Sequence, residues 1–287
     1  MPESPASIPR RPAGRLVLPA PAVNPAPRSP DPAAAPHRLR LLSYNIQAGI
    51  HSRHYRDYLA NGWKHILPHA ARLRNLAQIG AQLHGYDLVG LQEVDAGSLR
   101  SAHIDQTEYL AHQAGYSYWF AQINRRLGTL ARHSNGLLSQ LQPAAIIEHR
   151  LPGLPGRGAL VAEFPTSSGD SLAVCVLHLA LGWRARRRQL EYLVAVAHQY
   201  PFVVLMGDFN CGCGSRTLRM AVAASGLRGL DCGLKTFPSW RPAENLDHIL
   251  VSPSLRITEA GVVPYALSDH LPIRMLVELP AGVAISR

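Results

Sequence analysis

Residues Pro201–Ser215, PFVVLMGDFNCGCGS, constrain the fold of this chain more than any other segment. Phe202 to Met206 is a continuous apolar run, the pattern of a short strand that is buried on both faces. The run ends in Gly207-Asp208-Phe209-Asn210, where a carboxylate and an amide two residues apart project to the same side of an extended chain. These four residues fit a functional site and an Asp/Asn/Gly turn equally well. Whether these residues form a functional site or a turn therefore depends on whether other predicted strands end in the same way.

Several other predicted strands also begin or end in polar side chains. Leu39–Tyr44 leads into Asn45, Asp87–Leu91 into Gln92-Glu93, and Ser171–Leu177 into His178. Two later clusters precede strands at Ile249–Val251 and Leu271–Leu279. The boundary residues are Asn45, Glu93, His178, Asp208, Asn210, Asp247, Asp269 and His270. An α/β scaffold builds a site from strand ends that are distant in sequence, so this set predicts a catalytic centre.

The remaining periodicity indicates an α/β protein. Apolar residues recur at helical spacing over His69–His84, Asp105–Ala114 and Arg184–Tyr200. Further strands are predicted over residues 116–123, 135–141, 144–148 and 159–164. The segment His51–Pro68 is too long for a plain connection and predicts either a substrate-facing flap or a surface excursion.

Composition sets the domain boundaries and the expected location. The chain has 287 residues, of which 47% are hydrophobic, so it can bury a sizeable core. Residues 1–37 are rich in Pro, Ala and Arg without an apolar period and predict a disordered tail, which leaves residues 38–280 as the folded domain. No apolar run reaches the roughly 18–20 residues of a membrane helix, and no secretory signal is evident. We therefore expect a cytoplasmic monomer.

The net charge of +10 suggests an anionic partner. Only Lys64 and Lys235 are lysines, so the excess of arginine can also reflect genome base composition. Arginines crowd the start of the helix at Arg184–Arg188, where cations oppose the helix dipole, and a bound anion nearby would offset that cost. Arg186 and Arg188 are the candidate substrate contacts, with a solvated basic turn as the alternative.

The cysteines lack a paired spacing. Cys175, Cys211, Cys213 and Cys232 show no C-x-x-C pattern, so we predict free thiols and not a zinc site. Cys211 and Cys213 follow the predicted catalytic strand and are interpreted as bystanders.

The ordered motifs resemble the endonuclease/exonuclease/phosphatase superfamily. They are SYNIQ at Ser43–Gln47, LQEVD at Leu91–Asp95, HSNGLLS at His133–Ser139, LHL at Leu177–Leu179, GDFN at Gly207–Asn210, LDHILVS at Leu246–Ser252 and SDHLPI at Ser268–Ile273. The resemblance covers roughly residues 38 to 279. It implies a four-layer α/β sandwich, with two mainly antiparallel sheets packed face to face and helices outside.

The resemblance also implies roles for single residues. Glu93, Asn45 and Asp269 would hold Mg²⁺, with Mn²⁺ as a substitute. His270 would act at the scissile phosphate and Asp247 would orient its imidazole. Asp208 would position or deprotonate the attacking water, Asn210 would donate to a phosphate oxygen, and His178 would contact the phosphate or protonate the leaving oxygen. Asn135 would support the floor of the site.

The expected activity is hydrolysis of a phosphodiester by in-line attack of water, as in a nuclease. Gln47, the QEV glutamate motif and His178 depart from the apurinic endonucleases and point to the deoxyribonuclease and sphingomyelinase branch, which includes uncharacterised bacterial members. A phosphomonoesterase or a lipid-headgroup phosphodiesterase is the first alternative. A non-catalytic binding module on the same fold is the second.

Overall fold

Two six-stranded sheets form the centre of the protein. The structure is a computed structural model that describes residues 14–17, 37–49, 70–153 and 155–285. The first sheet contains, in spatial order, β1 (Arg15–Val17), β6 (Ala145–Arg150), β7 (Gly158–Pro165), β8 (Ser171–His178), β9 (Phe202–Asp208) and β10 (Asp247–Val251). The second contains β11 (Arg256–Val262), β12 (Ile273–Glu278), β2 (Arg38–Asn45), β3 (Leu88–Asp95), β5 (Ala131–Ser139) and β4 (Tyr118–Leu127).

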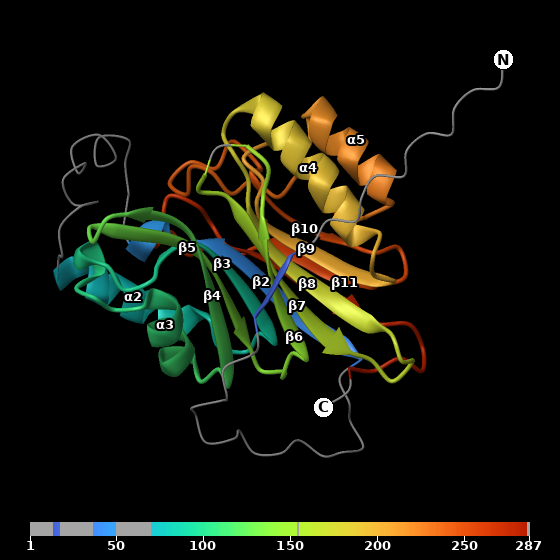
Figure 1. Cartoon of the computed structure of the whole chain (residues 1–287), viewed down its shortest axis with the longest axis horizontal. Coiled ribbons are helices and arrows are strands. Elements are labelled where there is room, and N and C mark those ends of the chain that lie inside the picture. Colours follow the sequence, from blue (N-terminus) through green and yellow to red (C-terminus); the bar gives the residue numbers. More distant parts are fainter. Residues whose placement is uncertain (1–13, 18–36, 50–69, 154, 286–287) are drawn as a thin grey trace.

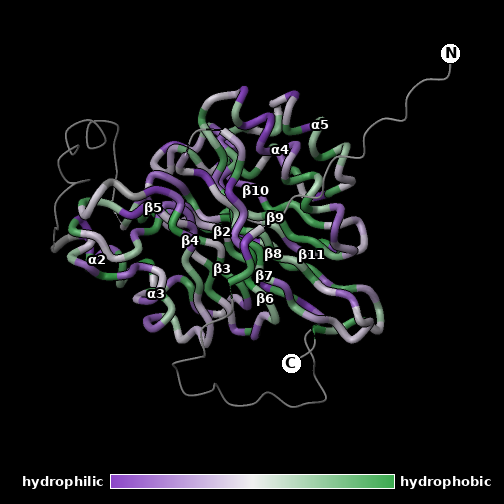
Figure 2. The backbone as a smooth tube through the Cα atoms, viewed as in Figure 1, coloured by the Kyte–Doolittle hydropathy of each residue, from purple (hydrophilic) through white to green (hydrophobic). Residues whose placement is uncertain are grey.

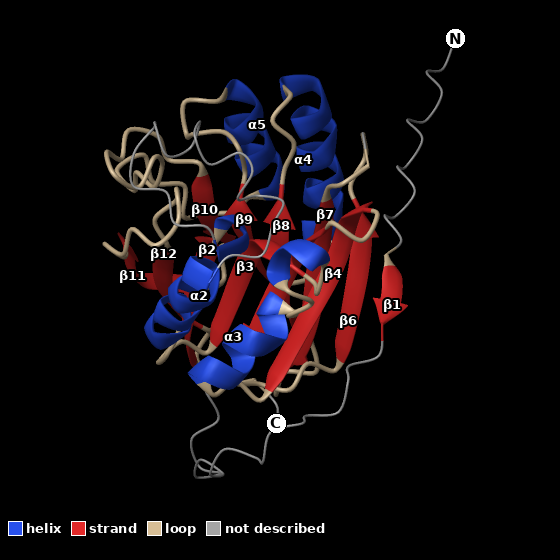
Figure 3. Ribbon diagram, turned by 90° about the vertical axis from the view of Figure 1, so that its left-hand side faces the viewer, coloured by secondary structure: helices blue, strands red, loops and turns tan. Residues whose placement is uncertain are grey.

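Helices cover the outer faces of both sheets. The helices α4 (Trp183–Ala197) and α5 (Arg216–Ser225) lie on the first sheet, and α2 (Ala70–Gln82) and α3 (Gln106–Ala114) lie on the second (Figure 1, Figure 3). Two short 3₁₀ segments, η1 (Gln47–Gly49) and η3 (Leu99–Ser101), follow β2 and β3. The result is the α/β sandwich predicted from the sequence. None of the described helices is long and apolar enough to cross a membrane.

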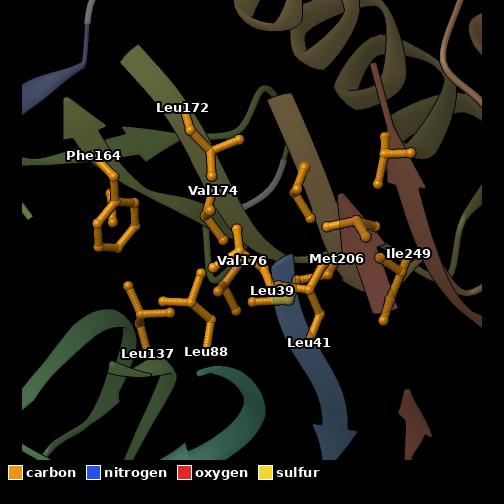
Figure 4. Close-up of a cluster of buried hydrophobic side chains, with 14 of the residues drawn as sticks. Leu39, Leu41, Leu88, Leu137, Phe164, Leu172, Val174, Val176, Met206 and Ile249 are labelled. Atoms are coloured by element: carbon orange, nitrogen blue, oxygen red, sulfur yellow. The ribbon is translucent and has the colours of Figure 1, made fainter. Parts of the chain in front are cut away.

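Three apolar clusters hold the layers together. The central cluster lies between the sheets and joins Leu41 and Leu88 of the second sheet to Val176 and Met206 of the first (Figure 4). The other two join α4 and α5 to the first sheet and α2 and α3 to the second. Strands that face another layer on both sides are apolar nearly throughout, as Figure 2 shows in green. Phe202–Asp208 is buried at every position, as the sequence predicted.

Most of the predicted helices and strands occur, but the structure also contains three elements that were not predicted. The tail was predicted to be disordered through residue 37, but Arg15–Val17 form β1, which pairs antiparallel with β6. The helix α5 and the strand β11 were missed. The strand β11 (Arg256–Val262) lies at the edge of its sheet and has no fully buried position. Its sequence therefore lacks the alternation of buried and exposed residues that would predict a strand. The segment His51–Pro68 and the rest of the predicted tail up to residue 36 lie outside the described residues.

Each sheet contains one parallel strand pair, and these pairs bring the polar strand ends together. In the second sheet β2 pairs parallel with β3, which aligns Asn45 with Gln92, next to Glu93. In the first sheet β8 pairs parallel with β9, which aligns His178 with Asp208. Since parallel strands end at the same edge, one rim receives all of these side chains.

A glycine makes the second of these alignments possible. Gly207 has a φ of 152°, and a Cβ atom at this position would lie 1.9 Å from the backbone carbonyl oxygen of Leu177. The backbones of β8 and β9 therefore approach too closely for any side chain. This approach sets the spacing between His178 and Asp208, the next residues along the two strands.

We predict that Gly207→Ala lowers the free energy of unfolding by about 3 kcal/mol, because the added methyl group would push two central strands apart. Urea denaturation followed by circular dichroism measures this change. Gly214→Ala is the matched control, because Gly214 is exposed and a Cβ there meets no atom within 4 Å. The control should change stability by no more than about 0.5 kcal/mol. An equal loss of stability in the two variants would contradict the close approach of β8 and β9 at Gly207.

Candidate functional site

Asp208 lies at the centre of the polar rim. Its carboxylate is buried, with the residue 2% exposed. Its Oδ2 accepts a hydrogen bond from Asn45 Nδ2 at 3.1 Å and lies 3.4 Å from His178 Nε2 and 4.0 Å from His270 Nε2. Its Oδ1 accepts from the backbone N–H of Asn210 at 2.8 Å. One carboxylate therefore contacts residues from both sheets and lies within reach of both predicted histidines.

His270 and Asp247 form a buried couple next to it. His270 Nδ1 lies 2.7 Å from Asp247 Oδ2, which also accepts a hydrogen bond from Thr236 Oγ1 at 2.5 Å. Asp247 stands opposite Asp208 in the antiparallel pairing of β9 and β10. This arrangement places the Nδ1 proton of His270 toward Asp247 and leaves Nε2 facing Asp208.

Glu93 reaches the rim from a β-bulge in β3. The pairing with β5 shifts register between Leu91 and Val94, and Glu93 has a φ of 56°. A positive φ at a residue other than glycine costs on the order of 1–3 kcal/mol and is found mainly at functional sites. The bulge turns the side chain toward the first sheet, where Glu93 Oε1 lies 3.9 Å from His178 Nε2.

Asn45 and Asp269 complete the set of hard oxygen donors. Asn45 Oδ1 accepts from the backbone N–H of Gln47 at 3.2 Å. Ser268 bridges the two residues, because its Oγ donates to the backbone oxygen of Asn45 at 2.7 Å and to Asp269 Oδ1 at 3.1 Å. The loop that carries Asp269 and His270 is thus tied to the end of β2.

Burial and neighbouring charges shift the pKa values of two carboxylates and two histidines of the rim. Burial raises the pKa of Asp208 to about 7, although the neighbouring His270 lowers it. Burial, with a contribution from the charge of Glu93, raises the pKa of Asp269 to about 6. Burial also lowers the pKa of His178 well below its usual value, so His178 is neutral at pH 7. For His270 burial acts in the same direction, but the charge and hydrogen bond of Asp247 outweigh it and raise the pKa to about 10.

A second group of residues could in principle bind a metal. Asp208, Asp247 and His270 each offer one ligand atom within 4.8 Å of the others. However, Asp247 Oδ2 and His270 Nδ1 are already bonded to each other, and a protonated imidazole cannot ligate a metal. The bond between Asp247 and His270 therefore leaves neither of these two atoms free for a metal. Glu93, Asn45 and Asp269 remain the oxygen donors that suit a hard divalent cation.

Asn210, in the loop after β9, and Arg186, in the first turn of α4, hold the rim in place. Asn210 has a φ of 51°, and its Nδ2 donates to the backbone oxygen of Leu179 at 2.8 Å. Arg186 Nη1 donates to the backbone oxygens of Leu181 at 2.8 Å and of Asn210 at 2.7 Å. Arg186 thus ties together the loops that follow β8 and β9. Arg188, the other arginine predicted to contact substrate, is exposed on α4 and does not line the cavity of the site.

A polar cavity of about 190 Å³ adjoins the reaction centre. Its lining residues are Glu93, Asn124, Arg125, His133, Ser134, Asn135, Pro155, Gly156, Arg157 and His178. Asn135 is buried and its Nδ2 donates to the backbone oxygen of Gly158 at 3.0 Å, which fits the predicted role in the floor of the site.

Arg157 is a residue that the sequence analysis missed. Burial lowers the pKa of its guanidinium, while the charges of Glu93 and Asp208 act in the opposite direction, so its charge lies near both carboxylates. It stands in a Pro-Gly-Arg-Gly turn before β7. Nothing in that turn distinguishes it from the other arginines of an arginine-rich chain.

Comparison with known proteins places the site in a broader context. Residues 42–270 match the family model described as the endonuclease/exonuclease/phosphatase family. No match was found among curated proteins.

Solved structures share the fold at low sequence identity. One is an endonuclease/exonuclease/phosphatase family protein from Bacteroides thetaiotaomicron, with a TM-score of 0.64, 17% identity, and coverage of 85% of this chain and 96% of that one. A mannosyl-6-phosphatase from the same organism has a TM-score of 0.62 and 18% identity over 83% of this chain and 99% of that one. The catalytic domain of human nocturnin has a TM-score of 0.59 and 18% identity over 84% and 94%.

A disulfide closes the loop behind the catalytic strand. Cys213 bonds to Cys232, 19 residues further along the chain, and the enclosed segment contains α5. The prediction that all four cysteines are free thiols was therefore wrong for this pair, which sequence spacing alone could not reveal. Cys175 and Cys211 are free and buried. The disulfide anchors the chain three residues beyond Asn210 and so supports the end of the catalytic loop.

We predict that the double substitution Cys213→Ser and Cys232→Ser lowers the free energy of unfolding by about 2–4 kcal/mol, because the unfolded chain loses a covalent constraint. Chemical denaturation with and without dithiothreitol measures the effect. Dithiothreitol should bring the wild-type protein to the stability of the double variant and leave the double variant unchanged. An equal effect of dithiothreitol on both proteins would contradict the disulfide.

Proposed function

Since this chain belongs to the endonuclease/exonuclease/phosphatase family, we propose that it is a metal-dependent hydrolase that cleaves a phosphoester bond by attack of water. The observation that carries the proposal is the position of Asp208, a buried carboxylate with a pKa raised to about 7 that lies within 4.0 Å of both histidines. A general base works best when its pKa is close to the working pH.

Glu93, Asn45 and Asp269 are the residues that would hold Mg²⁺ or Mn²⁺. The raised pKa of Asp269, to which the charge of Glu93 contributes, reflects two carboxylates that repel each other, and a divalent cation would compensate their charge. When bound, the cation would withdraw negative charge from the phosphate oxygens.

The other residues supply proton transfer and charge stabilisation. Asp208 takes the proton of the attacking water. His270, protonated because of Asp247, faces the phosphate with Nε2 and stabilises the charge that develops on its oxygens. His178 is neutral and orients water or the leaving oxygen, and Arg157 attracts the phosphate from the cavity side.

A small substrate fits this site better than a polymer. The cavity of about 190 Å³ is smaller than the roughly 300–1,000 Å³ of typical ligand sites, so it suits a compact headgroup. Of the two arginines predicted to contact substrate, Arg186 instead donates to loop carbonyls, and Arg188 is exposed on α4 outside the cavity. The structural similarity to a mannosyl-6-phosphatase supports a small phosphoester. Nucleic-acid cleavage is the second candidate, favoured by the net charge of +10.

The disulfide supports a cellular location outside the reducing cytoplasm. Disulfides persist mainly in oxidising compartments, and Cys213–Cys232 does not favour the cytoplasmic location expected from the sequence.

We predict that His270→Ala and Asp208→Asn each reduce kcat at least about a hundredfold, because each removes a group that acts on the reacting atoms. The assay is a Mg²⁺ panel of p-nitrophenyl phosphate, bis-p-nitrophenyl phosphate, sphingomyelin, RNA and plasmid DNA, with EDTA as the blank. His112→Ala, an exposed histidine on α3, is the control and should retain full activity. Near-normal metal-dependent turnover by His270→Ala would refute the proposed function.

A second prediction concerns metal binding and pH. The apo protein holds a proton on Asp269 below about pH 6, and a ligating carboxylate must be ionised. Mg²⁺ affinity should therefore fall as the pH is lowered through this value, and binding should release protons at about pH 6 but not at about pH 8.5. Titration calorimetry in two buffers of different ionisation enthalpy counts these protons. Equal affinity at both pH values would exclude Asp269 from the metal site, and Glu93→Gln should abolish binding.

A further inference from the structure

Two guanidinium groups, those of Arg125 and Arg157, line the cavity beside the reaction centre. Burial lowers the pKa of Arg157 and the charge of Arg125 acts in the same direction, so the two groups repel each other, while the charges of Glu93 and Asp208 attract Arg157. Within the described part of the chain neither guanidinium has a hydrogen-bond or ion-pair partner. Glu93 is the only carboxylate among the described residues of the lining, and we assign it to the metal. An anion in this cavity would relieve the repulsion.

The local backbone is shaped to aim these side chains into the cavity. The pairing of β4 with β5 shifts register between Ile123 and Arg125, so Asn124 is the extra residue of a β-bulge. A Cβ at Gly156 would lie 3.2 Å from Arg125 Cδ and 3.4 Å from its Cβ, which shows that the stem of Arg125 packs on that glycine. A Cβ at Gly158 would lie 2.1 Å from Asn124 Oδ1. Both glycines thus make room for side chains of β4, which belongs to the opposite sheet.

The cavity is adjacent to the reacting atoms without containing them all. It shares Glu93 and His178 with the centre, whereas Asp208, Asp247 and His270 lie outside its lining. A substrate whose phosphoester lies at Asp208 and His270 would therefore extend past His178 toward Asn124 and Arg125.

We propose that this cavity is a second anion subsite, in which Arg125, Asn124 and Arg157 bind an additional phosphate or carboxylate of a small substrate. The inference rests on the proposed phosphoester hydrolysis and narrows its substrate class. Arg157 contributes to both the subsite and the reaction centre, because the charges of Glu93 and Asp208 also act on its guanidinium group. Arg125 lines the cavity but has no hydrogen bond or ion pair with the described residues of the reaction centre, so it is the residue that sets specificity.

Three two-carbon phosphoesters test the subsite. Ethyl phosphate has no second anionic group, 2-phosphoglycolate adds a carboxylate, and ethylene glycol bisphosphate adds a phosphate. The full-length protein with Mg²⁺ should prefer one or both of the substrates with two anionic groups, and which of them is preferred identifies the group that the cavity takes. In Arg125→Gln the ratio of kcat/KM for the preferred substrate to that for ethyl phosphate should fall about ten- to a hundredfold, mainly through KM. Arg125→Lys should restore part of this ratio.

Controls separate this inference from the proposed function. Arg74→Gln removes an exposed arginine from α2 and should leave the ratio unchanged. Titration calorimetry with 3-phosphonopropionate and with propylphosphonate repeats the comparison without turnover, and the carboxylate should improve binding only while Arg125 is present. Hydrolysis of all three esters at equal kcat/KM would overturn the subsite while leaving the hydrolase intact. Hydrolysis of none of the panel substrates would overturn the proposed function itself.

A polymeric substrate would give a different result in the Arg125→Gln experiments. If Arg125→Gln impaired cleavage of a short oligonucleotide but not the selectivity among the two-carbon esters, the cavity would hold the neighbouring phosphate of a nucleic acid, and the small-substrate proposal would be wrong. A steep dependence of that cleavage on salt would accompany this result.

Discussion

The hydrogen bond from Asn45 Nδ2 to Asp208 Oδ2 joins the two sheets at the point where the site is built. Asp208 belongs to β9 of the first sheet and Asn45 to β2 of the second. A buried carboxylate is costly unless its lone pairs are satisfied, and here the partners come from different layers of the sandwich. The central apolar cluster must therefore hold both sheets at a fixed separation for this bond to form. The reactivity of the rim depends on the packing of the core beneath it.

The site combines rigid strands with strained connections. His178, Asp208 and Asp247 stand next to one another in strand register, so their relative positions are set by sheet geometry. Glu93 and Asn210, in contrast, have φ values of 56° and 51°, which cost free energy that the surrounding contacts must offset. For Asn210 those contacts are the bonds to Leu179 and Arg186. Two of the six described non-glycine residues with a positive φ therefore belong to the rim, where each follows or interrupts a regular strand.

The sequence was sufficient to predict whatever depends on a local pattern. Apolar runs that end in Asn45, Glu93, His178 and Asp208 marked the strand ends, and Asp105, whose side chain accepts from the N–H groups of Thr107 and Glu108, marked the start of α3. The features that depend on tertiary contact were not predictable. Cys213 and Cys232 meet only because the loop around α5 folds back, and β11 gains its stability from pairing with β12. The bulge that aims Glu93 likewise exists only relative to the partner strand.

The charge of the chain is distributed unevenly between its surface and the site. The excess of arginine is spread over the surface and loops, where Arg186 stabilises backbone and Arg187 pairs with Glu191. The interior of the site is instead acidic, because Glu93, Asp208, Asp247 and Asp269 gather there. An anionic substrate approaches such a centre favourably only if local cations outweigh the carboxylates. His270, kept protonated by Asp247, supplies one of these cations and Arg157 another. Under the proposed function, recognition depends on these few local charges, and the overall excess contributes mainly to long-range attraction.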